Sequence, residues 1–228
     1  MIAAIAAVRN EADIVELSMR HILAEGVDHV YVSLGPSADD TTKIVQVLAD
    51  ETGNVTCIID DDPTFRQAIV MNGLAARAGN DGYEWIVPFD ADEFIYAVDG
   101  DTVASALNQT QHDKLYLRMY RHHDWTRREV DHKPLPKVVY RWNPDARLAM
   151  GQHEVTIGGG TYGVLALREW QYRDYANFVA KRDLWLAQPD CGAHTLSLAG
   201  KDDAAIRAEY DAIMAIETVY DPIPSRAL

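Results

Sequence analysis

A short apolar segment, residues 85–89, ends abruptly in three carboxylates, Asp90, Asp92 and Glu93. Turn-forming residues precede it (Gly-Asn-Asp-Gly at 79–82), and this pattern predicts a buried strand of a parallel sheet. Carboxylates at the end of a buried strand are costly to pack unless each one meets a cation or water. In open α/β sheets, ligands bind at this edge. A bare Asp-x-Asp is more readily explained by a solvated acidic turn, so the interpretation as a ligand site depends on the strand before it.

The first ninety residues alternate between strand-like and helix-like patterns. Each apolar run of strand length is followed by a segment with apolar residues at helical spacing. This rhythm predicts βαβ units, and therefore a parallel sheet with right-handed connections. The predicted strands are 2–8, 27–34 and 55–59; the predicted helices are one capped by Asn10, one at 39–51, and one marked by Phe65, Ile69, Asn72 and Ala76.

Three of these strands end in a polar cluster. The clusters are residues 9–11 (Arg-Asn-Glu), residues 60–62 (three aspartates) and the motif of Asp90 and Asp92. Carboxyl ends of parallel strands meet at one edge, so the clusters outline a crevice for a nucleotide. The sequence has no Gly-x-Gly-x-x-Gly and no Walker lysine loop, which excludes the usual dinucleotide and P-loop interpretations. A site that binds phosphates without a glycine cradle needs a metal, and Asp90 and Asp92 are its predicted ligands.

Composition narrows the classes of function. The chain has 228 residues, which suits one α/β domain, or one such domain with an extension. Its 21 Lys and Arg against 35 Asp and Glu give a net charge of −14, which argues against a nucleic-acid groove. Cys57 and Cys191 lack metal-site spacing, and we expect two reduced thiols. No leader pattern is evident and no apolar run approaches the ~20 residues of a membrane span, so we expect a cytoplasmic protein.

The second half of the chain has weaker patterns. A loop rich in basic and polar residues at 127–133 would either steer an anionic donor or acceptor or form a solvated surface. The amphipathic pattern at 202–220 predicts a helix used for packing or as the surface of a homodimer. We also expect a short helix at 102–108 and strands at 114–120 and 136–142.

Three segments together resemble a known family. They are residues 7–14 (Ala-Val-Arg-Asn-Glu-Ala-Asp-Ile), 26–32 (Gly-Val-Asp-His-Val-Tyr-Val) and 84–94 (Glu-Trp-Ile-Val-Pro-Phe-Asp-Ala-Asp-Glu-Phe). In this order the segments are similar to the family 2-like glycosyltransferases of the GT-A fold, and nearest to a short bacterial branch with "RNE" and "DADEF" motifs. The resemblance is good over residues 1–96 and thinner to about 187.

The resemblance implies an α/β fold with a mostly parallel, Rossmann-like central sheet and flanking helices, plus a smaller antiparallel and helical acceptor half. Residues 1–96 would form the half that binds the nucleotide sugar, and 97–187 the acceptor half of the same domain. Residues 188–228 would form a C-terminal helical extension. Lys137 and Arg141 resemble a basic position before the acceptor region, and the segment that ends in Lys181 resembles the closing strand and helix of the family.

The resemblance also implies site residues. Mg²⁺ or Mn²⁺ would be held by Asp90 and Asp92, with His153 as a further ligand, while Glu93 would brace the loop from within. For His153 a hydrogen-bonded structural role is the alternative, and for Arg66 a surface ion pair. The residues expected to contact the nucleotide are Arg9, Asn10, Glu11, Asp60, Asp61, Arg66 and Asp90.

The implied activity is metal-dependent transfer of a sugar from a nucleotide-sugar donor, a UDP-sugar foremost, to a saccharide or glycolipid-type acceptor. An inverting reaction needs a carboxylate to deprotonate the acceptor hydroxyl. Asp124 is the first choice, and Glu154 and Asp131 are alternatives; Trp125 would stack on a sugar. The competing hypotheses are a non-catalytic nucleotide- or glycan-binding module and, with less support, a nucleotidyltransferase or phosphohydrolase, since no threonine follows the aspartates as a haloacid-type motif requires.

Overall fold

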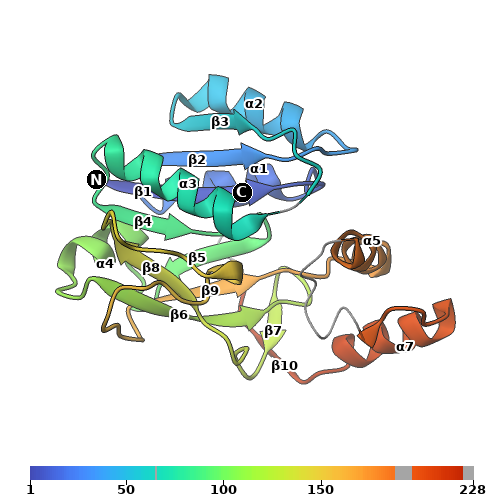
Figure 1. Cartoon of the computed structure of the whole chain (residues 1–228). Helices are drawn as coiled ribbons and strands as arrows, with labels where there is room; N and C mark the ends of the chain where they lie inside the picture. The colour runs from blue at the N-terminus through green and yellow to red at the C-terminus, as the bar shows by residue number, and fades with distance from the viewer. Residues whose placement is uncertain (65, 188–196, 223–228) are drawn as a thin grey trace.

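The computed structural model describes residues 1–64, 66–187 and 197–222. Eight strands form one sheet in the order β3-β2-β1-β4-β8-β6-β9-β5 (Figure 1). These strands are β1 (Ile2–Val8), β2 (His29–Leu34), β3 (Val55–Ile59), β4 (Trp85–Pro88), β5 (Glu93–Ala97), β6 (Lys114–Arg121), β8 (Lys137–Arg141) and β9 (Leu165–Glu169). A second sheet pairs β7 (Arg127–Glu129) with β10 (Thr218–Tyr220) in antiparallel fashion.

The strand directions place many chain ends at one edge of the large sheet. β1 pairs in parallel with β2 and β4, and β2 with β3. β8 runs antiparallel to both β4 and β6, β9 is parallel to β6, and β5 is antiparallel to β9. The carboxyl ends of β1 to β4, β6 and β9 therefore meet the amino ends of β5 and β8. We refer to this as the carboxyl edge.

Helices cover both faces of the sheet. On one face, α3 (Gln67–Asn80) packs Met71 and Leu74 against β1 and β2. On the other face, α1 (Val15–Ala24), α2 (Thr41–Thr52) and α4 (Val103–Gln109) contribute to the main apolar core. Figure 1 shows α3 in front of the strands and α1 behind them. The predicted alternation of strands and helices is confirmed, and the strand predicted at 55–59 matches β3 at both ends.

One predicted cap is wrong. The first helix begins at Val15 after Ile14, and Asn10 does not cap it. Asn10 instead has a positive φ of 55°, and its side-chain oxygen accepts a hydrogen bond from the Ala38 amide at 2.7 Å. Asparagine tolerates this left-handed conformation better than most residues. Asn10 therefore ties the loop after β1 to the loop after β2.

The helix predicted at 202–220 is shorter than expected. It is α7 (Asp203–Met214), whose amino end is capped by the Asp202 side chain, and the chain then forms β10. The residues after α7 pair with β7 instead of continuing the helix. Asp221, just beyond β10, holds this segment in place through ion pairs with Arg128 and Arg168 at 3.0 and 2.9 Å. Local periodicity contains no information about this distant partner.

The C-terminal segments form a small cluster of their own. α5 (Tyr175–Leu186) and α7 pack through Phe178 and Ile206 at the side of the sheet (Figure 1). The last predicted unit, 188–228, is described only over 197–222, and the Phe65 of the third predicted helix and Cys191 lie outside the described residues; Cys57 is a free thiol. No helix in the described part of the chain is long and apolar enough to cross a membrane.

Candidate functional site

Asp90 lies just beyond β4 and accepts hydrogen bonds from three side chains. Lys137, the first residue of β8, places Nζ 2.6 Å from Oδ2. Gln67 of α3 and Gln152 donate to Oδ1 at 3.2 and 3.3 Å. Gln152 is buried in the 3₁₀ turn η1 (Met150–Gln152) with a positive φ of 57°, a conformation that costs roughly 1–3 kcal/mol. Both oxygens of Asp90 are therefore already satisfied by nitrogen donors.

Glu93 braces the loop between Asp90 and the rest of the motif, as the resemblance implied. Its Oε2 accepts a hydrogen bond from the backbone amide of Asp90 at 2.9 Å, and Oε1 lies 3.1 Å from Lys137 Nζ. Burial raises the pKa of Glu93 well above its usual value, and the charge of Lys137 offsets this only in part. Glu93 is a structural partner of the loop with no solvent-exposed side-chain surface.

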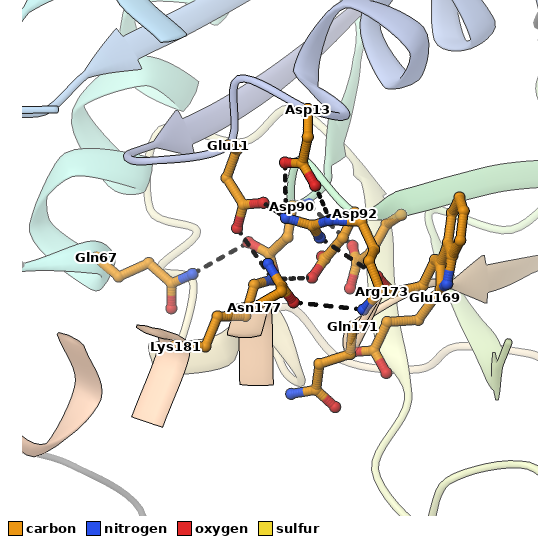
Figure 2. A network of polar contacts seen from close by, with 12 residues as sticks. Glu11, Asp13, Gln67, Asp90, Asp92, Glu169, Gln171, Arg173, Asn177 and Lys181 are labelled. Atoms are coloured by element: carbon orange, nitrogen blue, oxygen red, sulfur yellow. Dashed lines mark hydrogen bonds and ion pairs between the residues drawn. The ribbon is translucent and has the colours of Figure 1, made fainter. Parts of the chain in front are cut away.

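Asp92 is buried against a cation from a distant part of the chain. Its Oδ2 forms an ion pair with Lys181 of α5, whose Nζ also lies 3.0 Å from Glu11 Oε1. Arg173 binds Glu11 Oε2 at 2.6 Å and Asp13 Oδ1 at 2.9 Å. Figure 2 shows Lys181 and Arg173 reaching these carboxylates. Burial alone would raise the pKa of Asp92, but Lys181, with smaller contributions from Arg173 and Lys137, outweighs burial, so this pKa is lowered.

A pocket lies at the ends of the first three strands, one strand away from Asp90. Its polar lining includes Arg9, Asp60, Asp62 and Thr64, and Gly35 contributes to its wall. Arg9 Nη1 donates to the Pro63 carbonyl at 3.2 Å, but its Nε is buried without a hydrogen-bond partner. A buried donor without a partner is costly, and one that lines a pocket can be satisfied by a bound ligand.

The other predicted nucleotide contacts lie around this pocket. Asp61 is exposed. Arg66 is also exposed and pairs with Asp62 four residues earlier, which is the surface ion pair that we considered as its alternative. Glu11 and Asp90 belong to the ion-paired cluster described above. The structure therefore brings Arg9 and Asp60 together in one pocket, whereas Asp61 and Arg66 do not line it.

The donor set around the Asp-x-Asp motif does not fit a divalent ion in this arrangement. Asp90 and Asp92 each hold a different lysine ammonium, which would repel a second cation. His153 Nδ1 lies 2.7 Å from the Pro136 carbonyl oxygen and therefore donates to it, and burial lowers the pKa of this ring. Over residues 1–64, 66–187 and 197–222, no three His, Cys, Asp or Glu side chains are grouped to hold a metal ion.

Two of the three predicted bases, Asp124 and Glu154, have structural partners. Asp124 Oδ1 accepts hydrogen bonds from the Thr126 amide and hydroxyl, both at 2.7 Å, and Oδ2 from Arg127 at 2.8 Å. Burial is the largest single effect and opposes ionisation, but the hydrogen bonds from Thr126 and Arg127 together outweigh it and lower the pKa of Asp124 to about 2. Glu154 binds Lys114 and Tyr116, each at 2.8 Å. These contacts argue against Asp124 and Glu154 as general bases, because a base must be free to accept the proton of the acceptor.

Sequence reasoning did not predict the roles of three residues of the cluster. Lys181 and Arg173 act on Glu11 and Asp92 from more than eighty residues away, and Gln152 supports Asp90. The sequence contains only a weak indication of these roles. Lys181 stands on the same side of α5 as the buried Phe178, where a lysine is unexpected unless it is paired. Arg141, the other basic position singled out, pairs with Glu84 and Asp113 at the opposite edge.

The fold is similar to that of solved proteins, one of which is a mannosyltransferase. TarS 1-349 of S. aureus, in complex with UDP-GlcNAc, aligns with a TM-score of 0.52 and 12% identity over 86% of this chain and 69% of that one. A mannosyltransferase of Pyrobaculum calidifontis, in complex with GDP-Man and Mn²⁺, aligns with a TM-score of 0.51 and 16% identity over 94% and 80%. No protein-family model and no curated protein matches the chain. These likenesses confirm the predicted GT-A type of fold, and at such identities they show the fold alone.

Proposed function

We propose that this protein is a glycosyltransferase that moves a sugar from a nucleotide-sugar donor, foremost a UDP-sugar, to a hydroxyl of a saccharide or glycolipid-type acceptor. The observation that carries the proposal is the pocket at the carboxyl edge, which is lined by Arg9, an arginine whose Nε is buried without a hydrogen-bond partner. This is the edge at which open α/β sheets bind ligands. The shared fold adds support, because it belongs to solved proteins in complex with UDP-GlcNAc and GDP-Man.

The proposed donor lies along this edge. Its nucleoside occupies the pocket beside Arg9 and Asp60, with Asp61 and Arg66 at the rim and Asn10 holding the loop that forms one wall. Its phosphates extend toward β4, where Glu11 and Asp90 meet the cations Lys137, Arg173 and Lys181. Cations placed near a departing phosphate stabilise the charge that develops on it.

Transfer breaks the bond between the anomeric carbon and a phosphate oxygen and forms a bond to the acceptor oxygen, whose proton must pass to a base. We propose that the acceptor enters on the side of β6 and β9. There Trp125 and Trp170 lie edge to face with ring centroids 4.2 Å apart, and Trp170 Nε1 is buried without a partner. Exposed faces of such rings are suited to stacking on a sugar, which is the role expected of Trp125.

Calorimetric titration with UDP, GDP, UDP-GlcNAc and GDP-Man tests the donor site. We expect one nucleotide to bind, and Arg9→Met to weaken that nucleotide by at least about tenfold through loss of a charge-assisted contact. Arg20→Met is the matched control, because Arg20 pairs with Glu16 and Glu51 on α1 and α2 and does not line the pocket. Equal binding by both variants, or no binding by any nucleotide, would refute the proposal.

A non-catalytic nucleotide-binding module is the second candidate. It is favoured by the hydrogen bonds that hold Asp124 and Glu154, two of the three carboxylates predicted as bases. The two candidates differ in turnover. Release of free nucleoside diphosphate from the bound donor, lost in Arg9→Met and retained in Asp124→Asn, would identify an enzyme. Tight nucleotide binding without release in the presence of saccharide acceptors would identify the binding module.

A further inference from the structure

The ammonium of Lys181 occupies the space between two carboxylates that lie in the loops after β1 and after β4. Its Nζ lies 3.0 Å from Glu11 Oε1 and forms an ion pair with Asp92 Oδ2. The side chains of Lys181 and Asp92 are each 9% exposed, and that of Glu11 is 14% exposed. A divalent ion, which prefers hard oxygen ligands, would require such a pair of carboxylates and would supply the positive charge between them. In this protein the chain itself supplies that charge.

The neighbouring carboxylate is neutralised in the same way. Asp90 Oδ2 lies 2.6 Å from Lys137 Nζ, and its Oδ1 accepts hydrogen bonds from two glutamine side chains. The side chain of Lys137 is 2% exposed and belongs to a strand of the central sheet, so it has little freedom to withdraw. A divalent ion at Asp90 would have to displace this ammonium from a packed strand.

Each of the three carboxylates that a metal would need already faces a cation of the chain. Arg173 binds Glu11 and thereby provides a third cation beside Lys137 and Lys181, facing the three carboxylates of Glu11, Asp90 and Asp92. Asp13 also binds Arg173 but is half exposed, and water screens its charge. An added divalent ion would lie close to these buried cations and be repelled by them, which is unfavourable where little water is present to screen the charges.

We propose that Lys181 is the resident cation of this site, that it takes the position between Glu11 and Asp92 which a divalent ion would need, and that ligand binding at the carboxyl edge requires no metal. The last part rests on the proposed function, whereas the first two parts do not. Removal of the ammonium then leaves Glu11 and Asp92 as a vacant pair of carboxylates, so the loss of Lys181 should create a metal site that the natural protein lacks.

Electron paramagnetic resonance of Mn²⁺, titrated into the nucleotide-free protein, tests this directly because bound Mn²⁺ loses the sharp signal of the free ion. We expect Lys181→Ala to bind Mn²⁺ at one site, at least about tenfold more tightly than any binding by the natural protein. The double variant Lys181→Ala with Asp92→Asn should lose that site. Lys201→Ala is the matched control, because Lys201 pairs with Glu209 on α7. Mn²⁺ binding by the natural protein that disappears in Asp92→Asn would overturn the proposal, and so would a folded Lys181→Ala without a new site.

Two further measurements keep the test decisive. If Lys181→Ala does not fold, Lys181→Arg retains a cation and should still bind no Mn²⁺, and Mn²⁺ binding by this variant at Asp92 would overturn the proposal. The nucleotide identified by calorimetry should bind equally well, within about threefold, in Mn²⁺ and in a chelator. A strict need for Mn²⁺ would refute metal-independent binding. Absence of nucleotide binding in both conditions would instead refute the proposed function, while the Mn²⁺ titration would still decide the role of Lys181.

Discussion

Replacement of Lys137 by methionine should strongly destabilise the protein, because it leaves two carboxylates without their cation. Lys137 Nζ lies 2.6 Å from Asp90 Oδ2 and 3.1 Å from Glu93 Oε1. Loss of one partner of a buried ion pair costs about 3–5 kcal/mol. We expect the lower end, about 3 kcal/mol, since Asp90 is 33% exposed and can be hydrated. Glu93 has no exposed surface, and most of the cost should come from it.

Urea unfolding measures this loss. With an m-value of about 2–3 kcal/mol/M, a loss of about 3 kcal/mol lowers the midpoint by roughly 1 M. Lys201→Met is the matched control, because the Lys201 side chain is 35% exposed and its pair with Glu209 is worth at most about 1 kcal/mol. The Lys137→Met variant combined with Glu93→Gln should recover part of the loss, because the buried acid is then neutral.

The pH dependence of the Lys137→Met variant provides a second readout. Burial raises the pKa of Glu93 above its unfolded value of 4.5, so the folded state binds the proton more tightly than the unfolded state. The stability deficit of the variant should therefore shrink as pH falls from 8 toward 5, and Glu93→Gln should abolish this change. A loss under about 1 kcal/mol, or a deficit that is independent of both pH and Glu93, would refute the reasoning.

Two further predictions concern the scaffold and a turn. Gly79→Ala on α3 should lower the free energy of unfolding by about 1–3 kcal/mol, since the new Cβ would overlap the Trp142 indole. At Gly73 on the same helix a new Cβ would meet nothing within 4 Å, so Gly73→Ala should raise the free energy of unfolding by about 0.5–1 kcal/mol. Equal unfolding midpoints of the two variants would contradict the packing argument. Asp124→Asn should lose at most about 1 kcal/mol at pH 7, because a side chain that is 37% exposed is well screened. The pKa of Asp124 is lowered to about 2 from 3.8, so its contribution is complete above pH 3.8 and should vanish toward pH 2; a difference between variant and natural protein that persists in acid would contradict this role.

The sequence was sufficient to predict the carboxyl edge. Parallel strands share the direction of their carboxyl ends, so the polar residues after β1, β3 and β4 had to meet once the βαβ alternation was recognised. Arg9 and Asp60 do line one pocket, and Asp90 lies next to it at the end of β4. Periodicity and chain direction, which are local properties, fix this part of the structure.

The partners of the aspartates could not be predicted in the same way. Lys181 is 89 residues from Asp92, and their contact depends on how α5 packs beside the sheet. The turn that positions Gln152 requires a positive φ at a glutamine, which no local preference favours. The expected role of Asn10 as a helix cap failed for a related reason, because its side chain bonds to a loop 28 residues away. Each of these features is tertiary.

The energetics of the ion-paired cluster favour a functional interpretation of this edge. Buried ion pairs contribute little net stability, and well-packed apolar residues in their place are often neutral or stabilising. The sheet interior shows that this chain readily builds an apolar core, as with Val87 and Phe89 directly before Asp90. Yet at the carboxyl edge it buries Asp92 against Lys181 and supports Asp90 with a strained Gln152. Because fold stability does not require this arrangement, we infer that it is kept for ligand binding, and that exchange of Lys181 and Asp92 for an apolar pair would preserve folding while abolishing nucleotide binding.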